Sequence, residues 1–172
     1  MCIRDSYYTV KEGLRKNLPV ELSLIPFVES QFDPYARSAT GASGIWQFIP
    51  STAKENGLKK NWWYDGRRDI VASTEAAYGF LSKLYERYGD WLIAIAAYNA
   101  GPSRIRKEIE KNKKKGLPTD FWSLNLPRET KSYVPKILAI VELIRNPDRF
   151  DIQLPFLPVS YTHLRAHETL RY

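Results

Sequence analysis

Turn-forming residues divide this sequence into segments whose apolar side chains repeat at the spacing of an α-helix. Gly57, Gly89 and Gly101 each follow such a segment, and Asp69 and Asp90 stand where a side chain can cap the next one. No segment shows the sustained alternation of apolar and polar residues that is typical of a half-buried strand. The pattern therefore predicts a mainly α-helical chain of about seven helices, with little or no sheet.

The expected helices follow from these turns, and a length of 172 residues suits a single domain. They are residues 7–16, 19–30, 51–56, 70–88, 91–100, 103–114 and 128–144. We expect a polar loop over residues 31–43, because Asp33-Pro34 disfavours helix and both Gly41 and Gly44 permit tight turns. We expect extended chain over residues 150–158. No apolar run approaches the roughly 20 residues of a membrane span.

An acid continues the apolar face of the second expected helix. Leu18, Leu22, Ile25 and Glu29 recur at steps of four, three and four, so they share one helical face, whereas Glu21 lies off it. A carboxyl group on an apolar face loses solvation of its charged form, which raises its pKa and suits a general acid. A glutamate that bends back into solvent or pairs with a basic side chain is the alternative, and the spacing alone leaves both open.

The two ends of the chain are related through the genetic code. Codons exist by which residues 1–5 and 159–163 are translated from opposite strands of one DNA stretch, and that stretch resembles the transposon end used in preparing sequencing libraries. We therefore hypothesise that residues 1–6 and 159–172 are translated adapter, that 159–172 is disordered, and that residues 7–158 form the domain. Genomic DNA that encodes the same ends would contradict this hypothesis.

Thiol and imidazole side chains are confined to these ends. The single cysteine, Cys2, and both histidines, His163 and His167, lie outside residues 7–158. The two histidines have the helix spacing of a metal pair, but two ligands without further ones make a weak site. We therefore expect no metal and no cofactor, and we expect the chemistry to rest on carboxyl groups.

A formal net charge of +7 can favour nucleic acid, anionic membrane surfaces or acidic polymers as partners. Much of this charge lies in residues 111–115, a run that is equally typical of a solvated helix end, where cations meet the negative end of the helix dipole. No signature of a nucleic-acid-binding fold accompanies the charge. We expect no nucleic-acid partner and no membrane contact by this part of the protein.

Four segments carry the functional prediction. They are Glu29-Ser30, GASGIWQFIPSTA from Gly41, AAYNAGPSRI from Ala96 and RETKSYVPKIL from Arg128. Each alone has an ordinary structural explanation as a turn, a helix end or an amphipathic helix. In series, over about residues 18–143, they resemble the catalytic domain of lytic transglycosylases of the soluble-transglycosylase type, most closely the D group of membrane-bound lytic murein transglycosylases.

The resemblance implies a lysozyme-like, mainly α-helical single lobe that cleaves peptidoglycan glycan strands between N-acetylmuramic acid and N-acetylglucosamine. It implies that Glu29 is the sole catalytic carboxyl, which first protonates the leaving oxygen and then accepts the proton of the muramyl C6 hydroxyl as that oxygen attacks. The product is a 1,6-anhydro sugar. An ordinary glycosidase needs two carboxyls, one as acid and one as nucleophile or base, whereas an internal hydroxyl that replaces water lets one suffice.

The resemblance also implies substrate-binding or site-shaping positions. These are Ser38, Gln47, Ile49, Tyr98, Asn99, Glu129 and Tyr133. Glu129 is assigned to orienting substrate or core polar groups and not to proton transfer, while Asp33 is more typical of a turn-former than of a second catalytic carboxyl.

Tryptophans offer further contacts. Trp46 stands where many relatives have methionine and is expected to add an apolar wall beside Glu29. Trp62, Trp63 and Trp122 could stack on sugar rings, although aromatic side chains most often pack in a core, so we expect one of the three to touch a ligand.

Two alternatives remain open beside the transglycosylase prediction. A goose-type-lysozyme-like hydrolase would share the fold and Glu29 but would use water and release a reducing end. A non-catalytic cell-wall-binding module would bind the glycan without cleaving it. The family resemblance further implies a monomer in the periplasm, associated with the outer membrane in the full-length protein, with a signal and an anchor outside this sequence.

Overall fold

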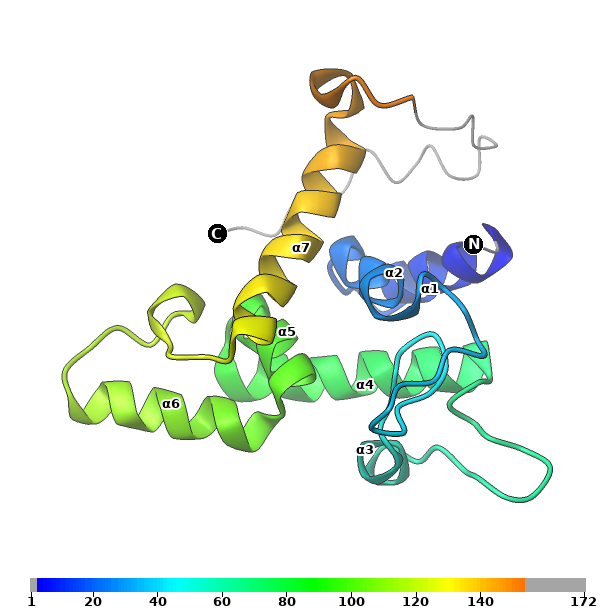
Figure 1. Ribbon diagram of the computed structural model, residues 1–172, viewed down its shortest axis with the longest axis horizontal. Helices are drawn as coiled ribbons and strands as arrows, with labels where there is room; N and C mark the ends of the chain where they lie inside the picture. Colours follow the sequence, from blue (N-terminus) through cyan, green and yellow to red (C-terminus); the bar gives the residue numbers. More distant parts are fainter. Residues whose placement is uncertain (1–2, 154–172) are drawn as a thin grey trace. The chain divides into compact units, whose positions relative to one another are not determined.

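The computed structural model describes residues 3–153, and the side chains from residue 6 onward. Within that range it contains seven α-helices and three short 3₁₀ helices, and it has isolated β-bridges but no strand. The α-helices are α1 Ile3–Arg15, α2 Ile25–Ser30, α3 Pro50–Glu55, α4 Ile70–Tyr88, α5 Trp91–Ala100, α6 Pro102–Lys114 and α7 Arg128–Arg145 (Figure 1). The 3₁₀ helices are η1 Val20–Leu24, η2 Phe121–Ser123 and η3 Pro147–Phe150. The mainly α prediction is confirmed.

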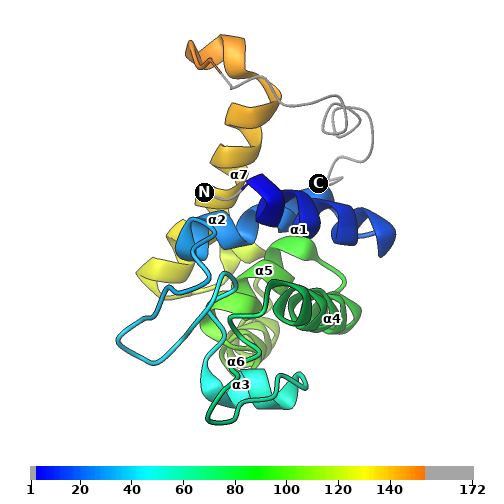
Figure 2. The same ribbon diagram turned by 90° about the vertical axis from the view of Figure 1, so that its right-hand side faces the viewer.

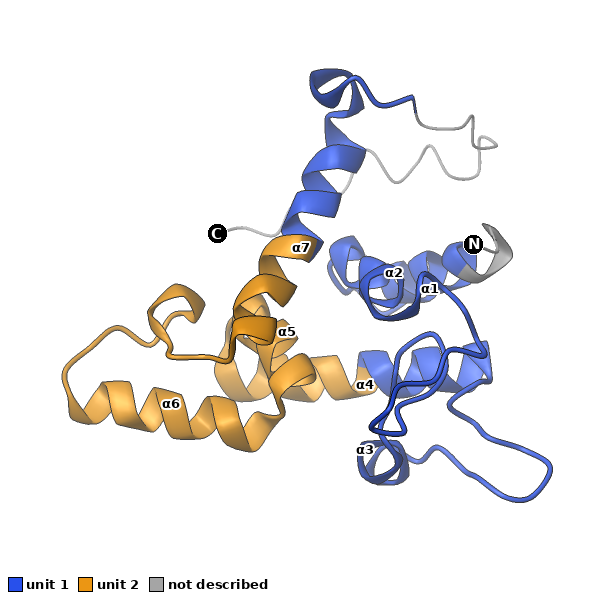
Figure 3. Ribbon diagram, viewed as in Figure 1, with its two compact units in different colours: residues 1–78, 137–172 blue, residues 79–136 orange. Residues whose placement is uncertain are grey.

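The chain divides into two compact units, which we describe separately. Unit 1 consists of residues 1–78 and 137–172, of which 3–78 and 137–153 are described, and unit 2 consists of residues 79–136 (Figure 3). In unit 1, η1 packs against both α1 and α2 (Figures 1 and 2). In unit 2, α5 packs against α6 and η2.

Buried aromatic side chains form the core of unit 1. Trp46 and Tyr78 are fully buried, and their rings meet edge to face with centroids 5.2 Å apart. Both polar ends are satisfied, because Trp46 Nε1 donates to Thr74 Oγ1 at 2.9 Å and the Tyr78 hydroxyl donates to the Thr9 carbonyl at 2.6 Å. Burial raises the pKa of Tyr78. These bonds join α1, the loop around residue 46 and the first half of α4.

The segment that leads to Glu29 is two short helices and not the single helix that the sequence predicted. Pro26 lacks an amide hydrogen and cannot donate to the Leu22 carbonyl, so the chain runs as η1 and then restarts as α2 with a proline in its first turn. Leu18, Leu22 and Ile25 are buried as predicted, and Glu29 is half-buried.

Glu21 corrects the sequence analysis, which placed it off the buried face. The 3₁₀ turn leaves Glu21 only 2% exposed, and its Oε1 accepts a hydrogen bond from Arg145 Nη2 in α7. Glu21 is therefore a deeply buried acid that is held in an ion pair with Arg145.

Unit 2 follows its predicted caps and turns. The amide of Ile93 donates to Asp90 Oδ1 at 3.0 Å at the start of α5, whose residues 92–97 are all buried. The Tyr88 hydroxyl donates to the Pro102 carbonyl at 2.9 Å, and Asn112 Nδ2 donates to the Pro118 and Ser123 carbonyls at 2.8 and 3.0 Å. Along α6 the remaining face is largely exposed and ends in the predicted lysine run.

Two boundaries differ from the prediction at the ends of the described range. Helix α1 begins at Ile3, so it includes residues that we assigned to adapter, and the assignment itself stays a prediction. Phe150 lies in η3 and not in extended chain. The expected disorder of residues 159–172 and the positions of Cys2, His163 and His167 lie outside the described residues.

Over residues 3–153, none of the helices combines the length and the apolar character that a membrane crossing requires.

Candidate active site

Glu29 lies in the last turn of α2, and its neighbour ties that helix to a loop. Ser30 Oγ lies 3.0 Å from the Ile45 carbonyl oxygen and 3.2 Å from the Pro26 carbonyl oxygen, so its hydroxyl can donate to either. The helix then ends in two left-handed residues, Gln31 and Phe32, and the Phe32 ring is buried. The end of α2 that carries Glu29 is thus held in unit 1 by the hydrogen bond of Ser30 and by the buried ring of Phe32.

The loop that Ser30 contacts is residues 36–48, which we call the glycine loop. It is closed by the bridges between Arg37 and Ser43 and between Ser43 and Phe48. Gly44 has a φ of 82°, and a Cβ there would lie 1.7 Å from the Arg67 carbonyl oxygen. Only glycine fits this close approach of two backbones.

Gln47 and Ser38 organise the glycine loop from within. Gln47 itself has a positive φ of 48°, and its Nε2 donates to the Gly44 carbonyl at 2.8 Å and to the Ala36 carbonyl at 3.3 Å. Ser38 Oγ accepts from the amide of Ala42 at 3.0 Å. Both predicted substrate residues therefore also hold the loop in shape.

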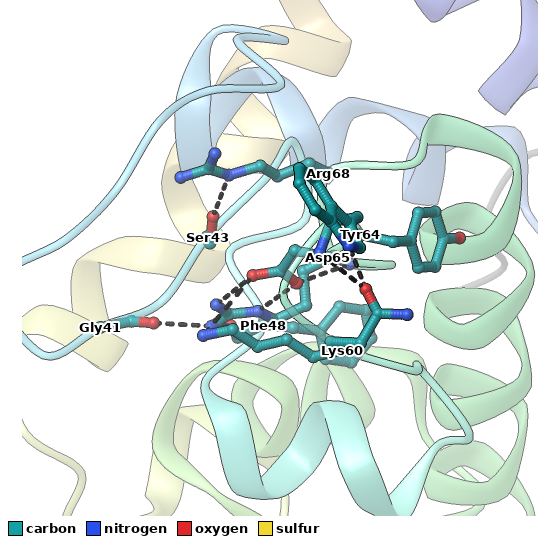
Figure 4. Close-up of polar contacts among 10 residues, drawn as sticks. Gly41, Ser43, Phe48, Lys60, Tyr64, Asp65 and Arg68 are labelled. Atoms are coloured by element: carbon teal, nitrogen blue, oxygen red, sulfur yellow. Dashed lines mark hydrogen bonds and ion pairs between the residues drawn. The ribbon is translucent and has the colours of Figure 1, made fainter.

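A second loop, residues 59–69, packs against the glycine loop, and we call it the Trp hairpin. Its buried Arg67 donates through Nη2 and Nε to Asp65 at 2.6 and 2.9 Å, and through Nη1 to the Gly41 and Phe48 carbonyls at 2.7 and 3.2 Å (Figure 4). The hydrogen bond from Arg67 lowers the pKa of Asp65. Arg68 Nε also donates to Ser43 Oγ at 3.3 Å.

Sequence reasoning missed this use of Arg67. The available signal was weak, because Asp65, Arg67, Arg68 and Asp69 form a mixed-charge run that is equally typical of a solvated loop.

Other predicted residues in unit 1 have distinct surroundings. Ile49 is 43% exposed and stands at the start of α3. Asp33 Oδ1 accepts from the amide of Tyr35 at 2.8 Å, which confirms its role as a turn-former. Trp46 is a core residue, so the expectation that it supplies a wall of the site is replaced by a packing role.

The remaining predicted residues lie in unit 2. Asn99 is half-buried, and its Oδ1 accepts from Thr130 Oγ1 at 2.8 Å. Tyr98 is half-buried with its ring centroid 5.7 Å from that of Phe80. Tyr133 is 5% exposed, whereas Glu129 is exposed. Thr130 joins α7 to the end of α5, and sequence reasoning missed it although it follows Glu129 in the quoted segment.

In the part of the chain that the structure describes, no three side chains of histidine, cysteine, aspartate or glutamate are grouped so that they could hold a metal ion.

Comparisons with known proteins agree on one family. The family described as Transglycosylase SLT domain matches residues 7–120. Membrane-bound lytic murein transglycosylase D of Escherichia coli (strain K12) is 48% identical over 162 residues, which cover 94% of this chain and 36% of that protein. A protein of Alteromonas sp. (strain M-1) named for tributyltin chloride resistance is 40% identical over 142 residues, 82% of this chain and 68% of its own length.

Solved structures give the same result for the fold. An inactive mutant of lytic transglycosylase Slt from Pseudomonas aeruginosa superposes with a TM-score of 0.62 at 28% identity, covering 89% of this chain and 25% of that one. The present chain thus spans about a third of the Escherichia coli relative and a quarter of the Pseudomonas protein.

Proposed function

The chain belongs to the transglycosylase SLT domain family, and on that premise we propose that it cleaves peptidoglycan as a lytic transglycosylase. The bond is the β-1,4 link between N-acetylmuramic acid and N-acetylglucosamine, and the product ends in 1,6-anhydro-N-acetylmuramic acid. The observation that carries the proposal is the Glu29-Ser30 pair at the end of α2, with Ser30 bonded to the glycine loop.

Glu29 is the acid and then the base of this reaction. Its protonated carboxyl gives a proton to the glycosidic oxygen as the bond to the muramyl C1 breaks. The resulting carboxylate then takes the proton of the C6 hydroxyl, whose oxygen forms the new bond to C1. Glu29 ends protonated, as it began, and no water is consumed.

Glu21 and Asp33, the acids nearest to Glu29 in the sequence, each have a structural role, so we assign neither of them as a second catalytic carboxyl. Glu21 is buried against Arg145, and Asp33 closes its own turn by accepting from the amide of Tyr35. A glycosidase that uses water needs a second carboxyl at a defined separation from the first. We therefore favour attack by the internal C6 hydroxyl over attack by water.

We divide the proposed substrate residues by their surroundings. Ile49 and Glu129 are exposed, so their side chains are available for direct contact with glycan. Ser38, Gln47 and Asn99 are hydrogen-bonded within their own units, and we propose that they hold backbone and side-chain donors in position. We propose that Tyr98 and the buried Tyr133 shape the surface of unit 2 around Asn99 and Glu129 and do not bind the glycan through their own polar groups.

The test is to incubate the chain with purified peptidoglycan and to weigh the released fragments. We expect fragments lighter by one water than hydrolytic products, and we expect Glu29→Gln to lower their rate of release on the order of 10²- to 10⁴-fold, the usual contribution of a general acid-base group. Hydrated fragments would identify a lysozyme-like hydrolase. Binding without any fragments would identify a wall-binding module.

The same proposal extends to location and assembly. The Escherichia coli relative is named membrane-bound, and we propose that this chain works in the cell envelope, at the peptidoglycan, as a monomer. Sedimentation at rising protein concentration should show one monomeric species, and a concentration-dependent dimer would contradict the monomer.

A further inference from the structure

The Trp hairpin displays two large aromatic side chains to solvent. Trp62 is 88% exposed and Trp63 is 90% exposed, and their rings stand nearly perpendicular with centroids 6.4 Å apart. Isolated apolar residues on a surface are ordinary, but two adjacent indoles with this exposure form a patch of the kind that binds a partner.

The hairpin holds these indoles on a fixed backbone. Asn61 Oδ1 accepts from the amides of Trp63 and Tyr64 at 2.9 and 2.8 Å, and the Asn61 amide donates to the Tyr64 carbonyl at 2.8 Å. The Tyr64 hydroxyl donates to Asp69 Oδ2 at 2.9 Å. A loop organised in this way loses little backbone freedom when a ligand binds.

The indoles border a pocket of about 660 Å³ within unit 1. Its wall includes the exposed side chains of Tyr35, Arg37 and Arg68. A pocket of this volume is in the range of small-ligand sites. Tryptophan, tyrosine and arginine are also the residue types that contribute most to binding energy at interfaces.

The charges of the pocket favour an anionic ligand. The carboxylate of Asp65 forms an ion pair with Arg67, and the carboxylate of Asp69 accepts hydrogen bonds from the Tyr64 hydroxyl and from the amide of Ala72. No carboxylate lies within ion-pair distance of Arg37 or Arg68 in the described range. Four basic side chains (Arg37, Lys60, Arg67 and Arg68) and two acidic ones (Asp65 and Asp69) line the pocket, so its positive charges are in excess.

We propose that this pocket binds the acidic stem peptide of peptidoglycan, an inference that rests on the proposed function. A stem peptide carries free carboxylates beside alanine methyl groups. Arg37 and Arg68 bind the carboxylates, for which the planar guanidinium is well suited. Trp62 and Trp63 cover the methyl groups and the peptide backbone. The pocket thereby selects glycan that still carries its peptides.

The first test is calorimetric titration of the chain with a synthetic stem tetrapeptide whose carboxylates are free. We expect saturable binding that weakens with added salt. We expect Arg37→Gln with Arg68→Gln to weaken it about tenfold or more, the effect of losing one or two charge-assisted hydrogen bonds. Lys113→Gln with Lys114→Gln, on the exposed end of α6, removes the same charge elsewhere and should leave binding unchanged.

A second peptide and a second variant separate carboxylate recognition from general attraction. The tetrapeptide with its carboxylates capped as amides should bind the wild-type chain as weakly as the free peptide binds the double arginine variant. Arg37→Lys with Arg68→Lys should recover only part of the affinity. Equal binding of free and capped peptide, or no saturable binding, would overturn the proposal.

Cleavage distinguishes failure of this inference from failure of the proposed function. On peptide-bearing strands the Arg37→Gln, Arg68→Gln variant should show a KM raised several-fold with an unchanged kcat, whereas strands stripped of peptides by an amidase should be cleaved as by wild type. Equal loss on both strands would mean that the pocket contacts sugar. Peptide binding by a chain that cleaves neither substrate would instead overturn the transglycosylase proposal and leave the pocket assignment standing.

Discussion

The glycine loop and the Trp hairpin of unit 1 are both irregular, yet they place their side chains in opposite ways. The glycine loop buries residues 42–46, while the Trp hairpin exposes residues 59–64. Both depend on Arg67, whose side chain reaches carbonyls of the glycine loop and whose own carbonyl packs against Gly44. One buried guanidinium thus supports a loop that stabilises the fold beside Glu29 and a loop that offers its side chains to solvent.

The difference shows that exposure and order are separate properties of a loop. Asn61 fixes the tip of the Trp hairpin by hydrogen bonds within the backbone turn, without burying any indole. Gln47 fixes the glycine loop in a similar way, but next to a buried apolar cluster. The backbone of the Trp hairpin is therefore held in place without burial of Trp62 or Trp63, and both side chains stay accessible to a ligand.

The largest expected effect comes from removing the shared support. Arg67→Met should lower the free energy of unfolding by about 3–5 kcal/mol, because it leaves the largely buried carboxylate of Asp65 with only the distant Lys60 Nζ at 4.0 Å, and it removes the donor to two carbonyls of the glycine loop. Urea denaturation of wild type and variant at pH 7 measures this. Arg68→Met is the matched control, because Arg68 is exposed and has only a long hydrogen bond of 3.3 Å to Ser43 Oγ, and it should cost about 1 kcal/mol or less. Equal losses in the two variants would contradict the role given to Arg67.

The second prediction breaks the close approach of the two loops. Gly44→Ala should cost about 2–4 kcal/mol, because the new Cβ overlaps the Arg67 carbonyl oxygen and the positive φ also disfavours a side chain. Gly41→Ala has the same φ of 82° with nothing within 4 Å of its Cβ, so it should cost only about 1 kcal/mol. Thermal or urea melts of both variants separate steric overlap from backbone strain. A Gly41→Ala loss as large as that of Gly44→Ala would refute the close-packing argument.

Sequence alone predicted six of the seven α-helices of the described range, the caps at Asp69 and Asp90 and the tight turns at Gly41 and Gly44, because these depend on neighbours in the chain. It also selected Glu29 by spacing and by family resemblance. It failed at Glu21, since the proline-imposed 3₁₀ turn changes which side chains face the interior. Its partner Arg145 stands 124 positions away in the sequence, beyond the reach of a periodicity argument.

The tryptophans show that the sequence alone does not predict which aromatic side chain of a loop is buried. Trp46 is fully buried and Trp62 is almost fully exposed, although each lies in a loop between one apolar and one polar neighbour. The environment of each is set by the path of the backbone, which Arg67 fixes through contacts that span 19 and 26 positions. No local sequence pattern predicts that Arg67 is buried and that its neighbour Arg68 is exposed.

A smaller effect follows from the lowered pKa of Asp65. A carboxyl whose pKa is depressed in the folded state adds stability that is fully present above its ordinary pKa of about 4 and is lost as the pH falls through the folded value. Asp65→Asn should therefore cost about 1–2 kcal/mol at pH 7, with the difference from wild type shrinking as the pH falls below about 4. Glu12 has its pKa lowered by Arg15 in both proteins, so it cancels in the comparison. If the difference in unfolding free energy between wild type and Asp65→Asn stayed the same from pH 7 to pH 2, the ion pair of Asp65 with Arg67 would not be its cause.

The smallest expected effect concerns the display of the indoles. Trp62→Ala with Trp63→Ala should change the free energy of unfolding by less than about 0.5 kcal/mol, because both side chains are almost fully exposed and neither supports the hairpin backbone. Trp46→Phe is the contrast, since it removes the hydrogen bond to Thr74 in the core and should cost about 2 kcal/mol. Urea titration of both variants gives the two values. A loss above about 1 kcal/mol in the double variant would mean that the indoles stabilise the fold and would weaken the case for a ligand. An unchanged stability would mean that the fold does not depend on the two exposed indoles, which leaves both of them available for the proposed contact with the stem peptide.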